Sequence, residues 1–449
     1  MRTRFDPTGP LRGSLRPPSD KSISHRAALI AAMGEGETRI EGYLDAADTR
    51  STLAAVRALR AEVTVDPPGK PGPRGVYPAW GGPSMPIEGP LRIRGVGLRG
   101  ARSAEIDVGN AGTLLRLLPG WLVGQDEGSW TLDGDDSIRQ RPVDRIAVPL
   151  REMGARLECR EGRLPPLTIE GSTLHGIDYE LPVASAQVKS CLLFAGLLAE
   201  GETRIVEPQR TRDHSERMLA AAGADVERDG DAVVIRPVER LQSGEIVVPA
   251  DFSSAAFFLV AAGLVGGSEV LLEHVGANPT RTGLLSILAR MGADIAVEPR
   301  GDIGGEPVAD LIVRSAALQA TDVGGTEVPL AIDELPLVAL AACFAEGTTT
   351  IRDAAELRRK ESDRIAAVTA ALSALGGQIE ATEEGMVIEG TGGLRGGAID
   401  SHGDHRIAML GAVAGLASEE GVEVGSIEAA AVSYPGFEAD LALLLRGGA

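Results

Sequence analysis

One charged run in the sequence could bind and protonate an anionic ligand: residues 360–364, with the sequence KESDR. It precedes an Ala/Leu-rich helical pattern that runs to Leu375, and the free N–H groups at a helix start favour anions. In a helical turn Lys360 and Arg364 would share one face, and Glu361 beside them could act as an acid whose proton affinity the cations tune. Taken alone, the run fits a solvated, salt-bridged helix start better.

A second cationic helix start lies at residues 21–26, with the sequence KSISHR, before an apolar helical pattern. Lys21 and His25, like Ser22 and Arg26, are i,i+4 pairs that face the same way. Helix-terminal amides, a hydroxyl and two cations suit a phosphate or a carboxylate. An ordinary basic helix start is the alternative.

Two loops add groups that could contact the same kind of ligand. Asn110 and Gly112 precede a helical pattern in GNAGTLLR. Gly112 would let a ligand approach the backbone closely, although a tight turn explains the glycines as well. Arg141 stands before Pro142, which holds the Arg141 backbone extended and should present its side chain outward. A surface turn is the alternative there.

Polar residues also open helical patterns further along the chain. Ser185, Ala186 and Gln187 precede an apolar helix predicted over 191–198, where they suit a polyhydroxylated ligand or simply cap the helix. Arg212 lies in a similar stretch, TRDHSE. Asp333 precedes an apolar helix predicted over 336–344, so it is either a partly desolvated base or the N-cap residue of that helix.

The last polar stretch, SHGDHR at residues 401–406, contains two histidines. No third ligand has suitable spacing for a metal, so capping by Asp404, with Arg406 aimed at an anion, fits better. At least five cations therefore lie at helix starts in both halves of an acidic chain, namely Lys21, Arg26, Arg141, Lys360 and Arg406. A site between two domains that closes over anionic ligands accounts for this repetition.

The helices and strands that must position these residues follow a recurring sequence pattern. A helical pattern ends in a Gly-Ala or Gly-Gly step and is followed by two strands. Copies lie at 150–158, 218–227, 288–295 and 372–380, with a weaker copy at 56–65. The glycine is a plausible helix C′ residue. Because the copies recur every roughly 70 to 85 residues, they indicate successive βαβ-type units rather than a solenoid.

Chain length and the positions of the repeated units predict how the units are divided between domains. A chain of 449 residues is too long for one ordinary core, so two domains are expected. The same unit starts afresh near 244–251, which is the predicted crossover between them. The Pro/Gly-rich stretch 67–90 is predicted to be a surface insertion.

Composition excludes several other classes of function. A net charge of −20 argues against binding to nucleic acids or anionic membranes. The three cysteines form no CxxC pair, so neither a zinc site nor a disulfide framework is indicated. No apolar signal core opens the chain, and the most apolar run, 255–265, is too short for a membrane helix. A soluble cytoplasmic protein is expected. GVGLRG at 95–100 lacks the helix and acidic partner of a dinucleotide site.

Nine short motifs, in order, resemble the 5-enolpyruvylshikimate-3-phosphate synthase family, the 3-phosphoshikimate 1-carboxyvinyltransferases. They are SDKSISHR, GNAGTLLR, RQRPVDR, ASAQVKS, TRDHSE, NPTRTG, IDELP, ELRRKESDR and GDHRIAM. The motifs ASAQ, NPTRTG and IDELP are similar to those of the bacterial class II branch of the family. The resemblance implies an α/β (α+β) fold of two domains that close like a clamp. Each domain is an inside-out barrel of three βαβαββ units, one formed by residues 17–245 and the other by 1–16 plus 246–449.

The resemblance also implies which residues hold two small-molecule substrates. Shikimate 3-phosphate would be held by Lys21, Ser22, Arg26, Ser185, Ala186, Gln187 and Arg212. Phosphoenolpyruvate would be held by Lys21, Asn110, Gly112, Arg141, Gln187, Lys360, Arg364 and Arg406. The implied reaction is an addition followed by an elimination, with Asp333 as the base and Glu361 as the proton donor. Lys21 and Lys360 are counted as catalytic with them, and the division of proton transfer between Glu361 and Lys360 is left open. No cofactor, metal, nucleic acid or membrane partner is expected, and the family expectation is a monomer.

Two positions bear on the resemblance in detail. Val432 stands before Ser433-Tyr434-Pro435 where many relatives carry lysine, so one phosphate contact is expected to be absent or supplied elsewhere. Position 112 is glycine, where some herbicide-tolerant class II relatives carry alanine. We therefore expect glyphosate to compete with phosphoenolpyruvate.

Three alternative functions fit the sequence less well than this family does. An enolpyruvyl transferase acting on UDP-N-acetylglucosamine would carry a reactive cysteine in the loop before RPVD, where this chain has residues 135–138, DDSI. An RNA 3′-phosphate cyclase is opposed by the acidic charge and the lack of a nucleotide-binding motif. A non-catalytic phosphate-binding scaffold would keep the cations but need neither Asp333 nor Glu361.

Overall fold

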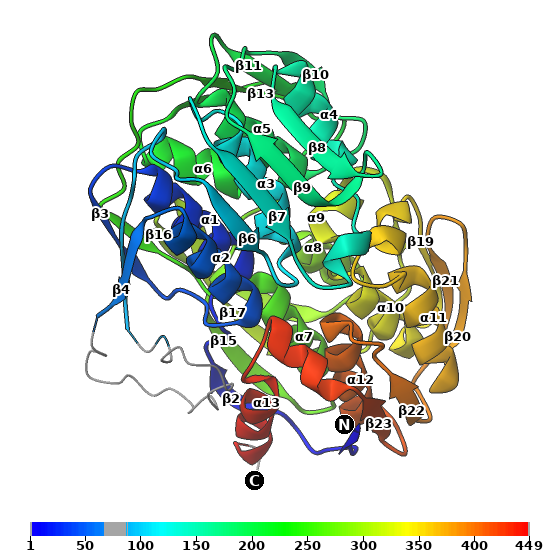
Figure 1. Cartoon of the computed structure of the whole chain (residues 1–449). Helices are drawn as coiled ribbons and strands as arrows, with labels where there is room; N and C mark the ends of the chain where they lie inside the picture. Colours follow the sequence, from blue (N-terminus) through cyan, green and yellow to red (C-terminus); the bar gives the residue numbers. More distant parts are fainter. Residues whose placement is uncertain (1, 67–86, 88, 448–449) are drawn as a thin grey trace.

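The computed structural model describes residues 2–66, 87 and 89–447. The predicted insertion at 67–90 lies almost entirely outside the described residues. The described strands form six small sheets, five of four strands and one of three, and the chain has the mixed α/β fold that the sequence predicts. The molecule has two halves, drawn one above the other in Figure 1.

The upper half contains three sheets with their helices. The first unit is built from β14 (Glu245–Val247), α1 (Lys21–Met33), β3 (Glu37–Glu41), α2 (Ala47–Ala58), β4 (Glu62–Val65) and β5 (Leu91–Arg94). The second comprises β6 (Ala104–Asp107), α3 (Gly112–Leu122), β7 (Ser129–Asp133), η1 (Ile138–Gln140), α4 (Asp144–Glu152), β8 (Arg156–Arg160) and β9 (Leu164–Glu170). The third comprises β10 (Asp178–Glu180), α5 (Ala186–Gly196), β11 (Thr203–Val206), α6 (His214–Ala221), β12 (Asp225–Asp229) and β13 (Ala232–Arg236).

The lower half repeats the plan. Its first unit is built from β2 (Arg12–Leu15), α7 (Phe252–Leu264), β15 (Glu269–Gly276), α8 (Gly283–Arg290), β16 (Asp294–Ile303) and β17 (Glu306–Arg314). The next comprises β18 (Asp322–Val323), η2 (Gly325–Glu327), α9 (Val328–Ala331), α10 (Leu335–Phe344), β19 (Glu346–Ile351), η3 (Ala355–Arg359), α11 (Arg364–Ala374), β20 (Gln378–Ala381) and β21 (Met386–Thr391). The last comprises β22 (Gly397–Asp400), α12 (His405–Ala417), β23 (Val422–Gly425), β1 (Arg2–Phe5), η4 (Ile427–Val432) and α13 (Phe437–Arg446).

The sheet register shows the βαβαββ order directly in the second unit. β6 and β7 pair in parallel across α3, and β8 and β9 return as an antiparallel hairpin, with β9 next to β7. Parallel neighbours need such a helical crossover, whereas antiparallel ones need only a turn. The third unit repeats the pattern with β10, β11, β13 and β12.

The Gly-Ala steps end helices in the way the sequence predicts. At each step the first glycine has a positive φ: Gly154 (97°), Gly223 (92°), Gly292 (87°) and Gly376 (95°). The next N–H donates to the carbonyl five residues back, as in Ala155 N to Leu150 O at 3.0 Å, which is the Schellman pattern. The weaker copy keeps this bond, from Ala61 N to Val56 O at 3.0 Å, but puts Arg60 at φ 80°.

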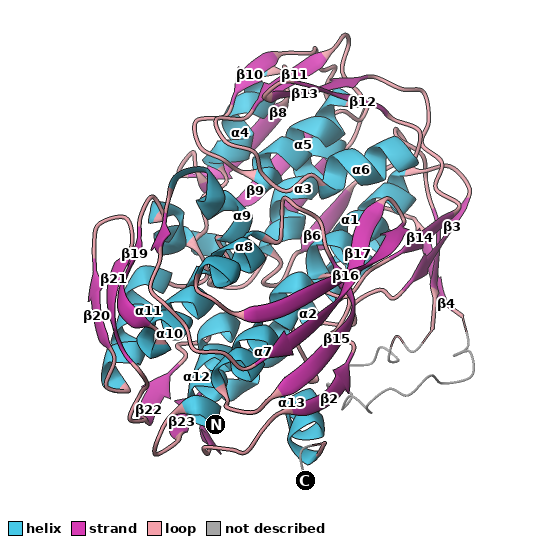
Figure 2. Cartoon of the chain, turned by 180° about the vertical axis from the view of Figure 1, so that it is seen from behind, coloured by secondary structure: helices cyan, strands magenta, loops and turns pink. Residues whose placement is uncertain are grey.

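In each half, helices pack together on the inside and sheets surround them, as Figure 2 shows. The inner helices are α1, α3 and α5 above and α7, α10 and α12 below, and they pack against one another. They are buried along most of their length, as expected for helices that are apolar all round. No helix in the described part of the chain is long and apolar enough to cross a membrane.

The hydrophobic core forms two clusters. One draws its buried residues from 23–248, and the other from 5–15 and 252–444. Two strands cross over to complete sheets: β2 precedes α1 in sequence but pairs with β15 below, and β14 precedes α7 but pairs with β3 above. The division into 17–245 and 1–16 plus 246–449 stays a prediction at the level of its boundaries.

The two chain segments that join the halves are hydrogen-bonded to each other. Asp20 N donates to Pro249 O at 2.8 Å, and Asp251 N donates to Pro18 O at 2.7 Å. Each aspartate is also an N-cap residue, Asp20 for α1 above and Asp251 for α7 below. Both inner helices therefore start at the junction between the halves.

Candidate active site

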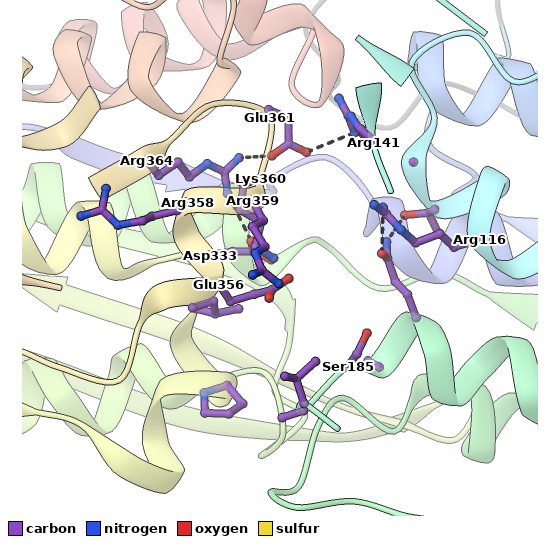
Figure 3. A pocket seen from close by; sticks show the side chains of 18 of the residues that line it. Arg116, Arg141, Ser185, Asp333, Glu356, Arg358, Arg359, Lys360, Glu361 and Arg364 are labelled. Atoms are coloured by element: carbon purple, nitrogen blue, oxygen red, sulfur yellow. Dashed lines mark hydrogen bonds and ion pairs between the residues drawn. The ribbon is translucent and has the colours of Figure 1, made fainter. Parts of the chain in front are cut away.

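A cavity of about 1790 Å³ lies between the halves, and residues of both line it. In Figure 3 the segment that carries Lys360, Glu361 and Arg364 faces Arg116 and Arg141 across this space. The predicted site residues that line the cavity are Lys21, Ser22, Arg26, Gly112, Arg141, Ser185, Ala186, Gln187, Arg212, Asp333, Lys360, Glu361, Arg364 and Arg406. Asn110 is the predicted site residue that lies behind the lining.

The KESDR run departs from the helical turn that the sequence suggests. Asp363 is the N-cap of α11, and its Oδ1 accepts a hydrogen bond from Ala366 N at 3.1 Å. Arg364 is therefore the first helical residue. Lys360 lies before the helix with an extended backbone (φ −86°, ψ −156°), so the two cations do not share a helical face. The Arg364 side chain is only 1% exposed, which contradicts a solvated helix start.

Asp333 is the point where cations from both halves meet. Arg212 Nη2, from the upper half, donates to Asp333 Oδ2. From the lower half, Arg364 Nη1 lies 3.3 Å and Lys360 Nζ lies 3.5 Å from Asp333 Oδ1. The alternative N-cap role is not adopted, because Glu334 occupies the N-cap position of α10. Burial alone would raise the pKa of Asp333, but Lys360, Arg212 and the other guanidiniums outweigh it and hold the pKa well below its usual range.

Glu361 is held in a similar field of positive charge. Arg364 Nη2 donates to Glu361 Oε2 at 2.6 Å, and Arg141 Nη1 from the upper half lies 3.9 Å from Glu361 Oε1. Burial favours the protonated acid, but the guanidiniums of Arg364 and Arg141 outweigh burial and hold the pKa of Glu361 well below its usual range. In this conformation the predicted proton donor is therefore a carboxylate.

The start of α1 presents two cations in different ways. Asp20 caps the helix by accepting from Ile23 N at 2.8 Å, a role that aspartate commonly takes. Lys21 Nζ pairs with Asp48 Oδ2 at 3.1 Å. Arg26 instead donates to neutral oxygens: Ser215 Oγ (2.7 Å), Ser190 Oγ (3.0 Å) and Ser22 O (2.9 Å). Burial lowers the pKa of Arg26 to about 10.

Near the start of α3, glycine allows two guanidiniums to approach the backbone. A Cβ atom on Gly112 would lie 2.8 Å from Arg141 Nη1 and 3.2 Å from Arg116 Nη1. Arg141 Nη2 donates to Asn110 Oδ1 at 2.8 Å, and Asn110 Nδ2 donates to Asp135 Oδ2 at 2.6 Å. No side chain caps α3, because its N-cap residue is Ala111. Asn110 positions Arg141 instead.

The start of α5 supplies uncharged donors and acceptors. Ser185 is its N-cap, and Ser185 Oγ accepts from Val188 N at 3.4 Å. Gln187 Oε1 accepts from Arg116 Nη1 at 3.2 Å, and Gln187 Nε2 donates to Thr113 Oγ1 at 3.3 Å. Both the capping role and the cavity-facing role foreseen for this segment are therefore present.

The structure adds cavity residues that the sequence reasoning did not single out. Arg116 is half-buried, and burial together with Arg141 and Arg145 lowers its pKa to about 10. His405 is buried, and burial and Lys21 lower its pKa to about 3, so the imidazole is neutral. Arg145 and Glu356 form a bidentate ion pair from one half to the other. All four residues lie inside motifs quoted above, GNAGTLLR, RQRPVDR, ELRRKESDR and GDHRIAM, so their motif membership was the available signal.

The cavity thus concentrates positive charge in an acidic chain and places carboxylates among the cations. Such a site can bind two multiply charged anions, orient them by fixed guanidiniums, and move protons through Asp333 and Glu361.

Comparison with known proteins agrees with this chemistry. The family model described as EPSP synthase (3-phosphoshikimate 1-carboxyvinyltransferase) matches residues 5–68 and 92–441. The stretch it skips, 69–91, falls within or next to the predicted insertion.

Individual proteins are similar over nearly the whole chain. A 3-phosphoshikimate 1-carboxyvinyltransferase from Gloeobacter violaceus is 51% identical over 97% of both chains. One from Alkalilimnicola ehrlichii is 50% identical over 97% of this chain and 94% of its own. A solved EPSP synthase structure from Acinetobacter baumannii superposes with a TM-score of 0.84 at 41% identity, covering 99% of this chain and 98% of that one.

Proposed function

Because the chain belongs to the EPSP synthase family, we propose that the cavity between its halves binds phosphoenolpyruvate and shikimate 3-phosphate side by side. The chain is a 3-phosphoshikimate 1-carboxyvinyltransferase. It transfers the enolpyruvyl group of phosphoenolpyruvate to the 5-hydroxyl of shikimate 3-phosphate and releases phosphate, in the shikimate pathway to chorismate and the aromatic amino acids. The observation that carries the proposal is the meeting of cations from both halves around Asp333 and Glu361.

The two substrates would occupy different parts of the lining. Shikimate 3-phosphate would be held by residues of the upper half, namely Lys21, Ser22, Arg26, Ser185, Ala186, Gln187 and Arg212. Hydroxyl and amide groups suit its ring, and cations suit its phosphate and carboxylate. Phosphoenolpyruvate would lie against Lys21, Gly112, Arg141, Gln187, Lys360, Arg364 and Arg406, with Asn110 acting through Arg141.

The cations that bind the substrates also control the two carboxylates. Without substrate, Lys360, Arg212 and Arg364 keep Asp333 ionised, and Arg364 and Arg141 keep Glu361 ionised. The phosphate and carboxylate of phosphoenolpyruvate would share these cations and add negative charge, which raises the pKa of nearby acids. Binding would therefore turn Glu361 into a usable proton donor and Asp333 into a stronger base.

The reaction then proceeds by addition and elimination. In the addition, Asp333 accepts the proton of the 5-hydroxyl, the oxygen forms a bond to C2 of phosphoenolpyruvate, and Glu361 delivers a proton to C3. In the elimination, C3 loses a proton, the C2=C3 double bond reforms and the bond from C2 to the phosphate oxygen breaks. Arg141, Lys360 and Arg406 would stabilise the charge on the departing phosphate.

Phosphate release tests the substrate assignment. The protein is incubated with phosphoenolpyruvate and either shikimate 3-phosphate or UDP-N-acetylglucosamine, and free phosphate is measured. We expect release only with shikimate 3-phosphate. Release only with the nucleotide sugar would contradict the proposal, and release with neither would favour a non-catalytic scaffold.

A substitution at Glu361 tests its role as the acid. Glu361→Gln keeps the shape but cannot deliver the proton, so we expect turnover and solvent-deuterium uptake into the methyl carbon to fall by about 100-fold or more. Full turnover with full isotope uptake would show that another group is the acid. Lys360→Gln in the same assay separates the contribution of Lys360.

Three further expectations are part of this proposal. Membership of the class II branch is supported by the wording of ASAQ, NPTRTG and IDELP. A cytoplasmic location fits a biosynthetic enzyme with an acidic surface. A monomer is expected because the site is built from one chain, and light scattering coupled to size exclusion would check it.

A further inference from the structure

A buried carboxylate that the proposed reaction does not use lies directly behind the cavity wall. Glu334 follows Asp333 in the chain, and its side chain is 0% exposed. Its partners are Arg281, whose Nη1 lies 3.2 Å from both carboxylate oxygens, and Arg406, whose Nη1 lies 3.4 Å from Oε1. Ser253 Oγ also donates to Glu334. A buried carboxylate is tolerated when cations and hydrogen bonds surround it in this way.

Arg281 and Ser253 also line the cavity, but they are more deeply buried than Arg406. Arg281 is 4% exposed, and its Nη2 lies 3.4 Å from Asp251 Oδ1 and also donates to Ser253 Oγ. Arg281 therefore sits between Asp251 and Glu334. The NPTRTG motif that contains it receives no role from the substrate assignment above.

Arg406 connects these more deeply buried residues to the cavity. Its Nη1 donates to the Asp333 carbonyl oxygen at 2.9 Å, and its Nη2 donates to Ser253 Oγ at 3.1 Å. Its side chain is 11% exposed, and it lines the cavity. A guanidinium recognises a phosphate or carboxylate through a planar fork, so its orientation decides how well it binds. Glu334 and Ser253 fix that orientation from behind.

We propose that Glu334, with Arg281 as its counter-ion, is a positioning residue that aims Arg406 at phosphoenolpyruvate. The two adjacent carboxylates have different roles. Asp333 faces the reacting groups, whereas Glu334 faces inward and holds the guanidinium of Arg406, which receives the substrate anion. The proposal rests on the proposed function, because it takes Arg406 to be a phosphoenolpyruvate ligand.

Three variants separate positioning from support of the fold. Glu334→Gln removes the charge at nearly constant shape. The double variant Arg281→Gln/Glu334→Gln removes both buried charges together, so no unpaired charge is left between these two positions. Ser253→Ala removes the hydroxyl that Glu334, Arg281 and Arg406 share. Glu298→Gln is the control, because Glu298 is half-exposed and pairs with Arg300 on the sheet surface.

The measurements are the KM for each substrate, kcat and the melting temperature. We expect Glu334→Gln to raise the KM for phosphoenolpyruvate by about 10-fold or more and to change the KM for shikimate 3-phosphate by less than about 3-fold. The double variant should regain most of the melting temperature, yet keep the raised KM for phosphoenolpyruvate because no carboxylate holds Arg406. Ser253→Ala should raise the same KM by about 3-fold, and Glu298→Gln should change neither KM.

Several results would overturn the proposal. Equal increases in both KM values, or recovery of the KM together with the melting temperature in the double variant, would mean that Glu334 serves only the fold. If the charge variants do not fold, an unchanged KM in Ser253→Ala would count against it. An inactive wild-type protein would instead refute the proposed function, and an Arg406→Gln variant with an unchanged KM for phosphoenolpyruvate would refute the role of Arg406.

Discussion

At position 112 a single hydrogen atom decides how close two guanidiniums come to the backbone. A Cβ atom there would lie 2.8 Å from Arg141 Nη1, closer than such atoms pack. The end of a long side chain can move, so Arg141 would shift rather than the backbone. Arg141 also donates to Asn110 Oδ1 at 2.8 Å, and the shift would strain that bond.

We predict that Gly112→Ala weakens phosphoenolpyruvate binding and glyphosate inhibition together, with glyphosate affected more. The wild-type protein should be inhibited by glyphosate in competition with phosphoenolpyruvate. The variant should show a KM for phosphoenolpyruvate raised by about 10-fold and a larger increase in the inhibition constant. Steady-state kinetics at several glyphosate concentrations measures both. Undiminished wild-type activity in millimolar glyphosate would contradict the prediction, and Gly263→Ala, where a Cβ atom meets nothing within 4 Å, is the control.

Residue types and spacing singled out charged residues that do line the cavity, because charged residues at helix starts need a partner. They did not predict which partner each residue chooses. Asp333 could cap α10 or face cations, and its contacts with Arg212 of the other half and with Lys360 and Arg364 of its own half decide for the cations. The contact of Asn110 with the substrate stays a prediction, and its hydrogen bond to Arg141 is one that the sequence did not predict. Both choices depend on contacts between residues far apart in the sequence.

At the scale of elements, the helix caps place the site residues. Asp363 ends the irregular KESDR run and starts α11, so Arg364 becomes the first helical residue. Asp404 does the same for α12 by accepting from Arg406 N at 2.9 Å, and it also holds Arg364 Nε at 3.0 Å. Two neighbouring cations are thus fixed by the ends of two helices.

We predict that Asp363→Ala loosens the first turn of α11, whereas Asp363→Asn does not. Alanine removes the acceptor for Ala366 N, which costs about 1 kcal/mol at a helix start. The exposed ion pair of Asp363 with Arg358 adds little. Hydrogen exchange should show about 5-fold faster exchange in the first turn of α11 for the alanine variant. Equal exchange in the two variants would show that the cap does not hold the turn.

Local sequence signals, such as the Gly-Ala steps, predicted helix ends well. The Gly-Ala steps have one physical cause, a left-handed residue after a helix, so they marked helix ends in both halves. The KESDR run had no such marker. Its helical periodicity suggested that Lys360 and Arg364 share a face, but the Asp363 cap starts the helix after Lys360.

At the scale of the whole molecule, local sequence patterns could not predict that the two halves exchange strands. β2 and β14 each pair in parallel with a strand from across the crossover, and a short strand carries no record of its distant partner. Length and the repeated unit predicted two halves. The joining of residues 1–16, which contain β2, to the second half entered only through the family resemblance, and the pairing of β14 with β3 was not predicted.

The stability of the lower half should depend on pH through one buried carboxyl. Burial raises the pKa of Asp440 to about 6, although Tyr434 Oη donates to Asp440 Oδ2 at 2.7 Å. The folded protein therefore binds this proton more tightly than the unfolded chain between about pH 4 and 6, and the contribution to stability falls as pH rises through that range. At pH 7 the buried charge opposes folding.

We predict that Asp440→Asn raises the free energy of unfolding at pH 7 by about 1 to 3 kcal/mol and has little effect near pH 4. Asparagine keeps an acceptor for Tyr434 and has no charge to bury. Urea denaturation at the two pH values measures the difference. The control is Glu438→Gln, an exposed position on the same helix. A gain in stability at pH 4 equal to that at pH 7 would show that the ionised carboxylate is not the cause.

The ion pair of Arg145 with Glu356 joins the two halves across the cavity and lies outside the proposed substrate and proton-transfer residues. Arg145 Nη1 and Nη2 lie 2.9 and 3.1 Å from the Oε1 and Oε2 atoms of Glu356, and the two side chains are 26% and 36% exposed. Halves that meet across a cavity are expected to move relative to each other. This pair therefore stabilises the conformation in which the cations of both halves surround Asp333.

We predict that Arg145→Gln and Glu356→Gln each raise the KM for both substrates by about 2- to 5-fold, and that the double variant is no worse than either. A half-exposed pair contributes up to about 1 kcal/mol, and that energy favours the closed arrangement for either substrate. The coupling should shrink in high salt because such pairs are screened. The control is Glu37→Gln, which breaks the pair of Glu37 (41% exposed) with Arg92 (39% exposed) within the upper half. Additive effects of the two variants, or an equal effect in the control, would show that the pair does not hold the halves together.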